Sequence, residues 1–467
     1  MLVGGEDMIK KIKSVFTKMR YINTILNRTY ENSEETKKLC GEIEIIKKEL
    51  NSIKEYNVRI NQTVNKIEKV TNKIEKVTNK TENGYDFYVN YEYSLLLHNK
   101  RKKILLVGFY GAKNLGDELM MQKIYTDLEH CQDDIWVMLC DNVDLDIFNY
   151  PITNIIHYPK TKFDYSFLAD QFECLIFGGG AIIDDGCYGV EDSYRYDMGR
   201  IFIELSTSFA EKGKEIYAIG LSASDCLTEK GYIKKLKNIV KKSQAFYVRD
   251  KYSQEVIEVA TDEKITSIND IVLTNQIQQN LLDVPCDCQL KKVGIIWVCY
   301  EEEWENCKKV IDKLNEMYSG NELLIKLIPF YDYCDNDFRF YEKVKEEYLN
   351  QDNIVIEKMA YDFEEIYTML KDLDLIISMR YHGALVGLMT GRNTYALLYG
   401  KHRHYKNKML DLFEKFNCGS HLCYNIEELL DNIKEENFVH QKLSEVVFDN
   451  SEYEKVINEI CTKYGRS

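Results

Sequence analysis

The chain has 467 residues, which predicts more than one domain, and a formal net charge of −15 at pH 7. Hydrophobic residues make up 45% of it and aromatic residues 12%, which excludes a largely disordered chain. The acidic balance argues against a general nucleic-acid binder, because a negative chain does not neutralise phosphates. An anionic substrate would therefore have to meet a local basic pocket.

The 14 cysteines are scattered along the chain, which favours reduced thiols in the cytosol. Cys286 and Cys288 have no second pair and no histidine nearby at the spacing of a zinc site. Met1–Lys13 carries no apolar run long enough for a signal peptide, and no stretch reaches the length of a membrane span. We therefore expect a cytoplasmic protein, and contact with a membrane surface stays open.

Residues 1–98 differ in composition from the rest and carry a heptad repeat. The sequence of Asn65–Thr71 recurs without change in Asn72–Thr78. An apolar stripe with the same period runs through Leu39, Ile46, Ile53, Ile60, Ile67 and Ile74, and four residues after these stand Ile43, Leu50, Asn57, Val64, Thr71 and Thr78. A single solvated helix would leave the isoleucines in water, so the pattern favours a coiled coil with a polar core position at Asn57. We expect it to make the protein a homo-oligomer, with the number of strands left open.

A strand, a loop with glycines and a helix follow the heptads. Lys103–Gly108 predicts a buried strand, and the helix runs through Leu119 to Leu128. This is the opening of a Rossmann-like unit, although the loop does not fit G-x-G-x-x-G and a nicotinamide site is not indicated. Asn114 and Asp117 at the strand end indicate a site, but Asp117 would serve equally well as a partner of the helix dipole.

Alternating strands and helices continue to about residue 270 and predict a parallel, doubly wound sheet. The strands are expected at Ile135–Leu139, Phe172–Phe177, Glu215–Gly220, Ala245–Asp250 and Ile265–Ile268, with helices at Tyr196–Lys212 and from Tyr252.

Three features of this first series are candidates for a site. Gly178–Gly180, after a buried strand, fits either a close approach of the backbone to a ligand or a tight turn. Arg249 would place a cation at a strand end, with a surface pair to Asp250 as the alternative. Asp184 and Asp185 stand near the same edge, but without more acids or histidines they are weak metal ligands.

A less regular stretch, residues 276–285, is expected to link this domain to a second series of strands and helices. Its strands are expected at Val293–Val298, Leu323–Ile328, Ile354–Ile356, Leu373–Ile377 and Thr394–Leu398, the last one, and its helices from Trp304, at Arg339–Leu349 and at Phe363–Leu370. Residues 426–467 predict helices, the last of which would cross back to the first domain.

Ser378–Leu385 joins the strand Leu373–Ile377 to the next helix and carries the clearest site signal. In an open α/β sheet, ligands bind beyond the carboxyl ends of the strands, and a helix N-terminus offers free N–H groups. Arg380 adds a bidentate cation there, and His382 adds a titratable donor. Together they predict a pocket for a small anion such as phosphate or carboxylate. The basic cluster Lys401–Lys408 is either a solvated surface or a second wall of that pocket.

The whole pattern predicts two Rossmann-like doubly wound domains preceded by an α-helical coiled coil. We place the coiled coil at residues 1–98, the first domain at 99–283 and the second domain at 284–467. Facing strand ends of two such domains would enclose a cleft, as in GT-B transferases, whose halves hold donor and acceptor. We expect the first domain to be the acceptor side and the second to be the donor side.

From about Lys102 to Phe416 the chain resembles the polysaccharide pyruvyl transferase family. Five motifs occur in the family's order: Gly108–Glu118, Gly178–Gly180, Val248-Arg249-Asp250-x-x-Ser253, Ser378-x-Arg380-x-His382-Gly383 and Tyr405-x-x-Lys408. Each motif is modest alone, but five in order make a specific match. The heptads lie outside it.

The resemblance implies a GT-B-like fold and transfer of a pyruvyl group from phosphoenolpyruvate to a sugar, which forms a cyclic ketal. In the family, the Arg of the R-D motif and the Arg and His of R-x-H-G are associated with the donor, and these carry over to Arg249, Arg380 and His382. Two guanidinium groups suit a small trianion with a phosphate and a carboxylate.

On this basis His382 is expected to be a protonated general acid, either to C3 of the donor or to the departing phosphate, and Asp117 is the candidate base for the acceptor hydroxyl. The residues expected to bind substrate are Arg249, Arg380, Lys408, Asn114, Gly111, Gly179, Gly180 and Gly383. The scheme needs no metal and no cofactor besides the donor substrate, phosphoenolpyruvate.

Two alternatives stay open. A GT-B glycosyltransferase that uses a nucleotide sugar would share the fold and hold a diphosphate at the same helix start. A non-catalytic assembly protein built on the coiled coil is disfavoured because Asn114, Asp117, Arg249, Arg380 and His382 are all present. The acceptor sugar and the ketal positions are not determined by the sequence. A lipid-linked acceptor at the inner membrane face is an expectation by analogy with members that act on cell-surface polymers.

Overall fold

A computed structural model of the chain describes residues 104–140, 152, 154–159, 162–186, 188, 197–274, 290–318, 322–332, 337–349, 351–398, 403–434 and 448–465. All of them belong to one compact unit, Leu95–Ser467. The predicted coiled coil, the predicted linker at 276–285, and Cys286 and Cys288 lie outside the described residues. Among the described helices, none combines the length and the apolar character that crossing a bilayer would take.

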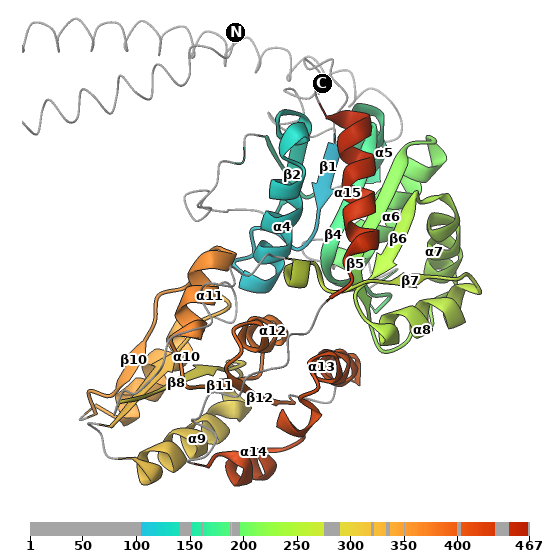
Figure 1. The fold of residues 1–467 in the computed structure, drawn as a ribbon. Coiled ribbons are helices and arrows are strands. Elements are labelled where there is room, and N and C mark those ends of the chain that lie inside the picture. The colour runs from blue at the N-terminus through green and yellow to red at the C-terminus, as the bar shows by residue number, and fades with distance from the viewer. Residues whose placement is uncertain are drawn as a thin grey trace, which may run out of the picture. The chain divides into compact units, whose positions relative to one another are not determined.

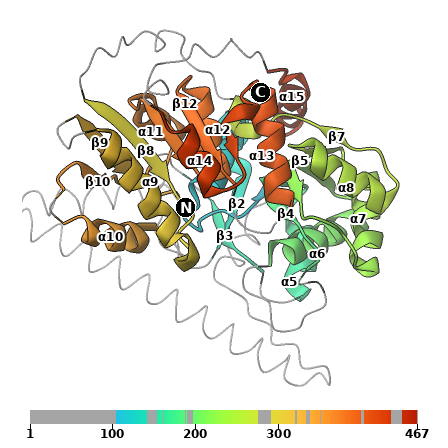
Figure 2. The same ribbon diagram turned by 90° about the horizontal axis from the view of Figure 1, so that it is seen from below.

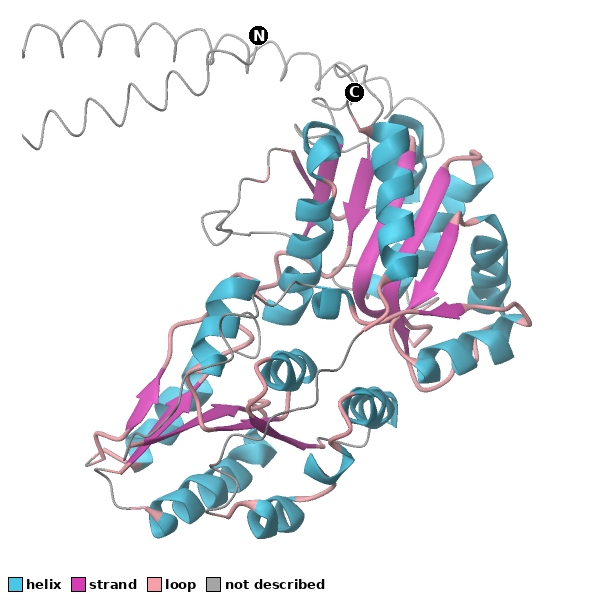
Figure 3. Cartoon of the chain, viewed as in Figure 1, coloured by secondary structure: helices cyan, strands magenta, loops and turns pink. Residues whose placement is uncertain are grey.

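The first domain is built on a seven-stranded parallel sheet with the strand order β3-β2-β1-β4-β5-β6-β7 (Figures 1 and 3). Its strands are β1 (Ile104–Val107), β2 (Ile135–Leu139), β3 (Ile155–His157), β4 (Cys174–Ile183), β5 (Glu215–Ala223), β6 (Ala245–Val248) and β7 (Thr266–Ser267). Its helices are α4 (Leu115–Asp127), α5 (Lys162–Gln171), α6 (Met198–Glu211), α7 (Lys230–Lys242), α8 (Lys251–Thr261) and the 3₁₀ turns η2 (Glu129–Asp134) and η4 (Ile271–Thr274).

The second domain repeats this plan with a six-stranded parallel sheet in the order β10-β9-β8-β11-β12-β13. Its strands are β8 (Lys291–Ile296), β9 (Leu323–Leu327), β10 (Ile354–Ile356), β11 (Leu375–Ser378), β12 (Asn393–Leu397) and β13 (Leu422–Cys423). Its helices are α9 (Trp304–Met317), α10 (Asp337–Glu347), α11 (Phe363–Lys371), α12 (Tyr381–Met389), α13 (Arg403–Lys415), α14 (Ile426–Asn432) and the turns η6 (Glu301–Glu303) and η7 (Gly419–His421). The last helix that the structure describes is α15 (Ser451–Tyr464).

Both sheets reverse their strand order once, between β1 and β4 and between β8 and β11. Loops on the two sides of such a switch point leave in opposite directions, which opens a crevice beyond the strand ends. The strands β1 and β11 consist only of buried residues, as expected for parallel strands that helices cover on both faces. The two switch points therefore mark where ligands would bind.

The prediction of two parallel α/β domains is confirmed, and most predicted elements are present. Three details of the prediction were wrong. The strand predicted to end at Phe177 continues through Gly178–Gly180 to Ile183, so these glycines form no tight turn. Thr394–Leu398 is not the last strand, because β13 follows it. The elements β3, α5 and α7 were not predicted.

The glycines of β4 allow helix α4 to lie close to the strand. A Cβ atom on Gly179 would lie 2.3 Å from Met120 Sδ, and one on Gly178 would lie 2.4 Å from Ile124 Cδ1. Gly179 also has a φ of +77°, a conformation that favours glycine. These glycines thus fix the distance between a strand and the helix that begins at the site.

Helix α15 returns to the first domain, as predicted, and lies beside its sheet (Figure 1). Its buried face carries Tyr453, Val456 and Ile460, which belong to the same apolar core as residues of β1 and α4. Tyr453 donates a hydrogen bond to Asp127 at 2.7 Å, and Tyr217 of β5 donates one to Glu459 at 2.9 Å. Each fully buried apolar side chain of this kind contributes about 1.5–3 kcal/mol of burial free energy.

The two domains contact each other directly beside the start of α4. Leu115 N–H donates to Phe330 O at 2.9 Å, and Asn114 and Tyr331 form an antiparallel β-bridge. Helix α13 of the second domain also lies next to α8 of the first (Figure 2). The contacts of Asn114 and Leu115 thus join the loop after β1 to the loop after β9, and the helix contact adds a second region where the domains meet.

Candidate active site

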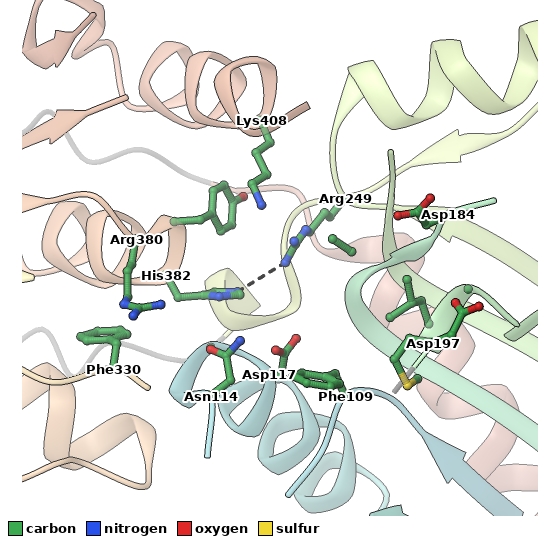
Figure 4. Close-up of a pocket in the computed structure, with 16 residues that line it drawn as sticks. Phe109, Asn114, Asp117, Asp184, Asp197, Arg249, Phe330, Arg380, His382 and Lys408 are labelled. Atoms are coloured by element: carbon green, nitrogen blue, oxygen red, sulfur yellow. Dashed lines mark hydrogen bonds between the residues drawn. The ribbon is translucent and has the colours of Figure 1, made fainter. Parts of the chain in front are cut away.

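A cavity of about 480 Å³ lies where the carboxyl edges of the two sheets meet (Figure 4). Its walls come from the loop after β1, the end of β4, the end of β6, the start of α12 and helix α13. The lining residues are Phe109, Asn114, Gly116, Asp117, Ala181, Ile182, Asp184, Asp197, Met198, Gly199, Arg249, Phe330, Arg380, Tyr381, His382 and Lys408.

Arg249 follows β6 and is 3% exposed. Its Nε donates to Ser222 Oγ at 2.8 Å, and its Nη1 donates to Asp270 Oδ2 at 2.9 Å. The alternative of a surface pair with Asp250 is wrong, because Asp250 is buried and accepts hydrogen bonds from Ser253 N–H and Ser222 Oγ. Arg249 is therefore a buried cation held in place from two sides.

Arg380 is the residue before the first turn of α12, and its guanidinium lies across the pocket from Arg249 (Figure 4). Its Nη2 donates to Asp337 Oδ1 at 2.5 Å, and the group lies 5.7 Å from the centre of the Tyr331 ring. Asp337 is fully buried and also accepts from Phe330 N–H and Tyr331 N–H. Among the described residues, the buried Arg380 Nε has no hydrogen-bond partner, and 18% of the Arg380 side chain stays exposed at the pocket.

His382 lies in the first turn of α12 and points into the first domain (Figure 4). Its Nε2 is 3.4 Å from Arg249 Nη1 and 3.5 Å from Asp270 Oδ2. Burial lowers the pKa of His382, the cations Arg249 and Lys408 lower it further, and Asp270 opposes them. This lowered pKa favours the neutral imidazole at pH 7 when no anion is bound.

Helix α4 makes room for the imidazole at Gly116. A Cβ atom at this position would lie 1.9 Å from His382 Nδ1. The residue before the helix, Asn114, lines the same pocket. Glycine at this position therefore lets a histidine of the second domain pack against the first turn of a helix of the first domain.

Asp117 and Lys408 stand on opposite sides of His382 (Figure 4), and both have pKa values near neutrality. Burial raises the pKa of Asp117 to about 7, although Arg249 and Lys408 oppose this. Burial and the charge of Arg249 lower the pKa of Lys408 to about 7. Groups that change protonation state near pH 7 are suited to proton transfer, and they cluster in active sites.

Both alternatives for the basic cluster Lys401–Lys408 apply, each to a different lysine. Lys408 lines the pocket and lies 5.3 Å from the centre of the Tyr381 ring, which is the second-wall alternative. Lys406 is exposed and lies 4.6 Å from the centre of the Tyr424 ring, which is the solvated-surface alternative. Lys401 and His402 lie outside the described residues.

Four of the predicted glycines support the pocket without lining it. Gly111 has a φ of +77°, and its N–H donates to the buried Glu118 at 2.8 Å. Gly179 and Gly180 pack against α4, where a Cβ on Gly180 would lie 3.2 Å from Asp117 Oδ1. Gly383 lets α12 pack on the sheet, since its Cβ would lie 2.6 Å from Ser378 Oγ. Asn114, Asp117, Arg249, Arg380, His382 and Lys408 are brought together in the pocket.

The far end of the pocket, on the first domain, carries Phe109, Asp184 and Asp197 (Figure 4). Asp184 accepts a hydrogen bond from Gly186 N–H at 2.8 Å, and Asp197 accepts one from Arg200 N–H at 3.1 Å. Burial raises the pKa of Asp197. Nowhere in the described residues do three or more His, Cys, Asp or Glu side chains come together as a metal site would require.

The sequence analysis missed three residues that hold the site together: Gly116, Asp270 and Asp337. Asp270 follows the short strand β7, and the same strand-end argument that singled out Arg249 would have found it. Asp337 begins a helix, where an aspartate is usual, so no sequence signal distinguished it. Gly116 stood in a glycine-containing motif without an assigned role.

Two Rossmann-like domains that share a cationic pocket at their switch points define a GT-B-like enzyme architecture. A sequence model of the polysaccharide pyruvyl transferase family matches residues 114–402, more than half of the chain. The chain therefore belongs to the polysaccharide pyruvyl transferase family, a family of transferases. None of the curated proteins compared matches the sequence significantly.

Two solved structures are similar to this chain at low sequence identity. The Anabaena protein HepE, solved in complex with UDP and glucose, is 11% identical, and the match covers 78% of this chain and 100% of HepE with a TM-score of 0.50. The UDP-GlcNAc 2-epimerase from Neisseria meningitidis, bound to UDP-GlcNAc, is 11% identical over 77% of this chain and 100% of its own, with a TM-score of 0.49. The likeness to HepE shows a common fold.

Proposed function

We propose that this protein moves a pyruvyl group from phosphoenolpyruvate to a saccharide and forms a cyclic ketal. One observation carries the proposal: Arg249, Arg380 and Lys408 line one small pocket together with His382. Phosphoenolpyruvate places a phosphate and a carboxylate on a three-carbon unit, so its binding needs several cations within a short distance. Membership of the pyruvyl transferase family supports the same donor.

The three cations would share the two anionic groups of the donor. Arg380 lines the pocket with a partly exposed side chain, while Asp337 fixes its Nη2. Arg249 is already oriented by Ser222 and Asp270. An anion beside Lys408 would raise its pKa from about 7, so the lysine would be charged once the donor is bound.

The first chemical step adds one acceptor hydroxyl to C2 of the donor. The hydroxyl oxygen forms a bond to C2, its proton passes to Asp117, and the π electrons of the C2–C3 bond take a proton from His382 at C3. The product is a phosphorylated hemiketal with a methyl group. His382 must be protonated for this step, and the negative charge of the donor favours that form.

The second step replaces phosphate with a second hydroxyl of the same acceptor. The new oxygen forms a bond to C2, and the bond from C2 to the phosphate oxygen breaks with its electron pair. Asp117 returns its proton to the departing phosphate, and His382 accepts the proton of the second hydroxyl. Both groups then regain their starting protonation states, and inorganic phosphate and the ketal are released.

We place the acceptor at the end of the pocket formed by Phe109, Asp184 and Asp197. An aromatic ring offers a flat apolar surface to a sugar, and carboxylates accept hydrogen bonds from hydroxyl groups. This end belongs to the first domain, in keeping with its expected acceptor side.

Titration calorimetry of phosphoenolpyruvate into the wild type and Arg380→Ala tests the donor. We expect binding to the wild type and a loss of roughly 10–100-fold in affinity in Arg380→Ala, since a charged hydrogen bond contributes about 1.5–3 kcal/mol. Arg339→Ala, an exposed arginine on α10, is the matched control and should bind like the wild type. Equal affinity of all three proteins would contradict the assignment.

The glycosyltransferase alternative is tested in the same experiment with UDP-glucose. The cationic pocket could hold a diphosphate, and HepE, which shares the fold, was solved with UDP and glucose. Binding of UDP-glucose together with no binding of phosphoenolpyruvate would favour a nucleotide-sugar donor over our proposal.

A further inference from the structure

Asp270 is a buried carboxylate that joins the two domains at the donor cations. It lies in the loop between β7 and η4, and its side chain is fully buried. Its Oδ1 accepts from Val272 N–H at 2.9 Å, which fixes the carboxylate to its own loop. Its Oδ2 faces Arg249 Nη1 at 2.9 Å and His382 Nε2 at 3.5 Å. One oxygen atom therefore contacts a cation of the first domain and the imidazole of the second.

Three atoms form a triangle: Asp270 Oδ2, Arg249 Nη1 and His382 Nε2, with the last two 3.4 Å apart. The guanidinium can only donate a hydrogen bond, and the ionised carboxylate can only accept one. A bare Nε2 therefore suits Arg249, whereas a protonated Nε2 suits Asp270. The proton on Nε2 therefore decides the partner: the neutral Nδ1–H tautomer suits Arg249, whereas the imidazolium and the neutral Nε2–H tautomer both suit Asp270.

The charged groups around His382 decide how readily its imidazole takes up a proton. Arg249 after β6 and Lys408 on α13 oppose a proton on the imidazole, while Asp270 favours it. Asp117 on α4 lines the same pocket, and the centre of the Tyr381 ring lies 5.1 Å from the centre of the imidazole. A bound anion would offset the two cations and leave Asp270 as the decisive neighbour.

Asp270 itself stays ionised in this setting. Burial alone would raise the pKa of Asp270, but His382, Arg249 and the Val272 N–H hold it below its usual value. Because Arg249 carries a permanent charge, Asp270 keeps a partner even when His382 is neutral.

We propose that Asp270 is a positioning residue that makes donor binding load a proton onto His382: the anion occupies Arg249, and the protonated Nε2 turns its hydrogen bond to Asp270. This rests on the proposed function, because it names the donor as the anion. Beyond that function, the proposal adds a coupling through Asp270 that keeps His382, the general acid, uncharged until the donor is bound.

Asp337 provides a matched comparison. It is also a fully buried aspartate paired with a donor-site arginine, Arg380, but no contact described for it joins it to His382. A purely structural role of Asp270 would resemble that of Asp337. The proton affinity of His382 separates the two roles.

The first test is an NMR titration of protein labelled at the histidine ring carbons, between pH 4.5 and 9, with the His382 signal assigned by its loss in His382→Gln. Relative to the wild type, Asp270→Asn should lower the proton affinity of His382 at least tenfold, whereas Asp337→Asn should change it less than twofold. The same proton affinity in Asp270→Asn and the wild type would overturn the proposal. This measurement needs no donor, so it decides the role of Asp270 even if phosphoenolpyruvate proves to be the wrong substrate.

The second test follows the same signal at pH 7.5 while phosphoenolpyruvate is added. In the wild type it should move to the imidazolium position as the site fills, and in Asp270→Asn it should stay at the neutral position. The wild-type result stands by itself if Asp270→Asn does not fold. A neutral signal at saturation in the wild type would overturn the coupling, whereas a failure to bind phosphoenolpyruvate would count against the proposed function.

Discussion

The two arginines of the pocket are each held by one buried aspartate. Asp270 fixes Arg249 and Asp337 fixes Arg380, so each guanidinium has one edge in the protein and another facing the pocket. A buried ion pair adds little net stability, because both charges lose their hydration. The pairs instead orient the cations before a ligand arrives, which reduces the ordering that binding would otherwise require.

Asp117 should weaken the fold at neutral pH. Its raised pKa of about 7 means that the folded protein binds a proton that the unfolded chain releases near pH 4. The free energy of unfolding therefore falls as pH rises from about 4 to 7 and stays low above pH 7. Removing the carboxylate should remove this loss of unfolding free energy.

Asp117→Asn should accordingly be more stable than the wild type above pH 7, by roughly 1–3 kcal/mol, and equally stable near pH 4. The figure is below the full value of the pKa shift because the carboxylate faces the pocket. Thermal unfolding at pH 4, 6 and 8 measures the difference, with the exposed Asp431→Asn on α14 as control. A gain independent of pH would contradict the buried charge as its cause.

At the scale of elements, the site depends on how closely two helix starts approach each other. The first turn of α4 contacts the first turn of α12 through Gly116 and His382. Gly116→Ala would push the imidazole out of its present position and lower turnover by about 100-fold, since displacements near 1 Å can cost that much. Steady-state kinetics of Gly116→Ala and of the wild type measures this loss of turnover.

The control for this helix contact is Gly419→Ala. A Cβ atom at Gly419 meets nothing within 4 Å, so its turnover should match that of the wild type. If Gly116→Ala also keeps wild-type turnover, the imidazole does not need its present position.

The strand-end rule explains how much could be predicted from the sequence. Arg249, Arg380 and His382 each follow an apolar run, so the topology of an open parallel sheet is enough to place them at one edge. The residues that hold them could not all be found in this way. Asp337 is far from Arg380 in sequence, and only the tertiary arrangement pairs the two. Likewise, Gly178–Gly180 were expected to form either a close backbone approach to a ligand or a tight turn. They instead continue the strand β4, where Gly178 and Gly179 leave room for side chains of α4.

At the scale of the molecule, the site belongs to neither domain alone. His382, Arg380 and Lys408 come from the second domain, whereas Asp117, Arg249 and Asp270 come from the first. Any movement of one domain against the other would therefore change the protonation balance of the pocket as well as its width.

The heptads of residues 1–98 remain a prediction, and they make a testable statement about the assembly. The mass of the full chain in solution, measured by light scattering, should be at least twice the mass of one chain. Replacing two core positions, Ile60→Asp together with Ile67→Asp, should reduce it to that of one chain, because charges in a coiled-coil core lose hydration without a partner. A wild-type chain that is monomeric would contradict the coiled coil.

The return of α15 to the first domain has a consequence for biosynthesis. The first sheet is complete at β7, near Thr274, but the helix that covers it begins only at Ser451. At 5–20 residues per second, the ribosome needs about 10–35 s to make the chain between these points. During this interval the apolar surface later covered by Tyr453, Val456 and Ile460 is open to water and to chaperones. A nascent chain that stops before Ser451 therefore cannot close the apolar core of the first domain, although all strands of that sheet have been made.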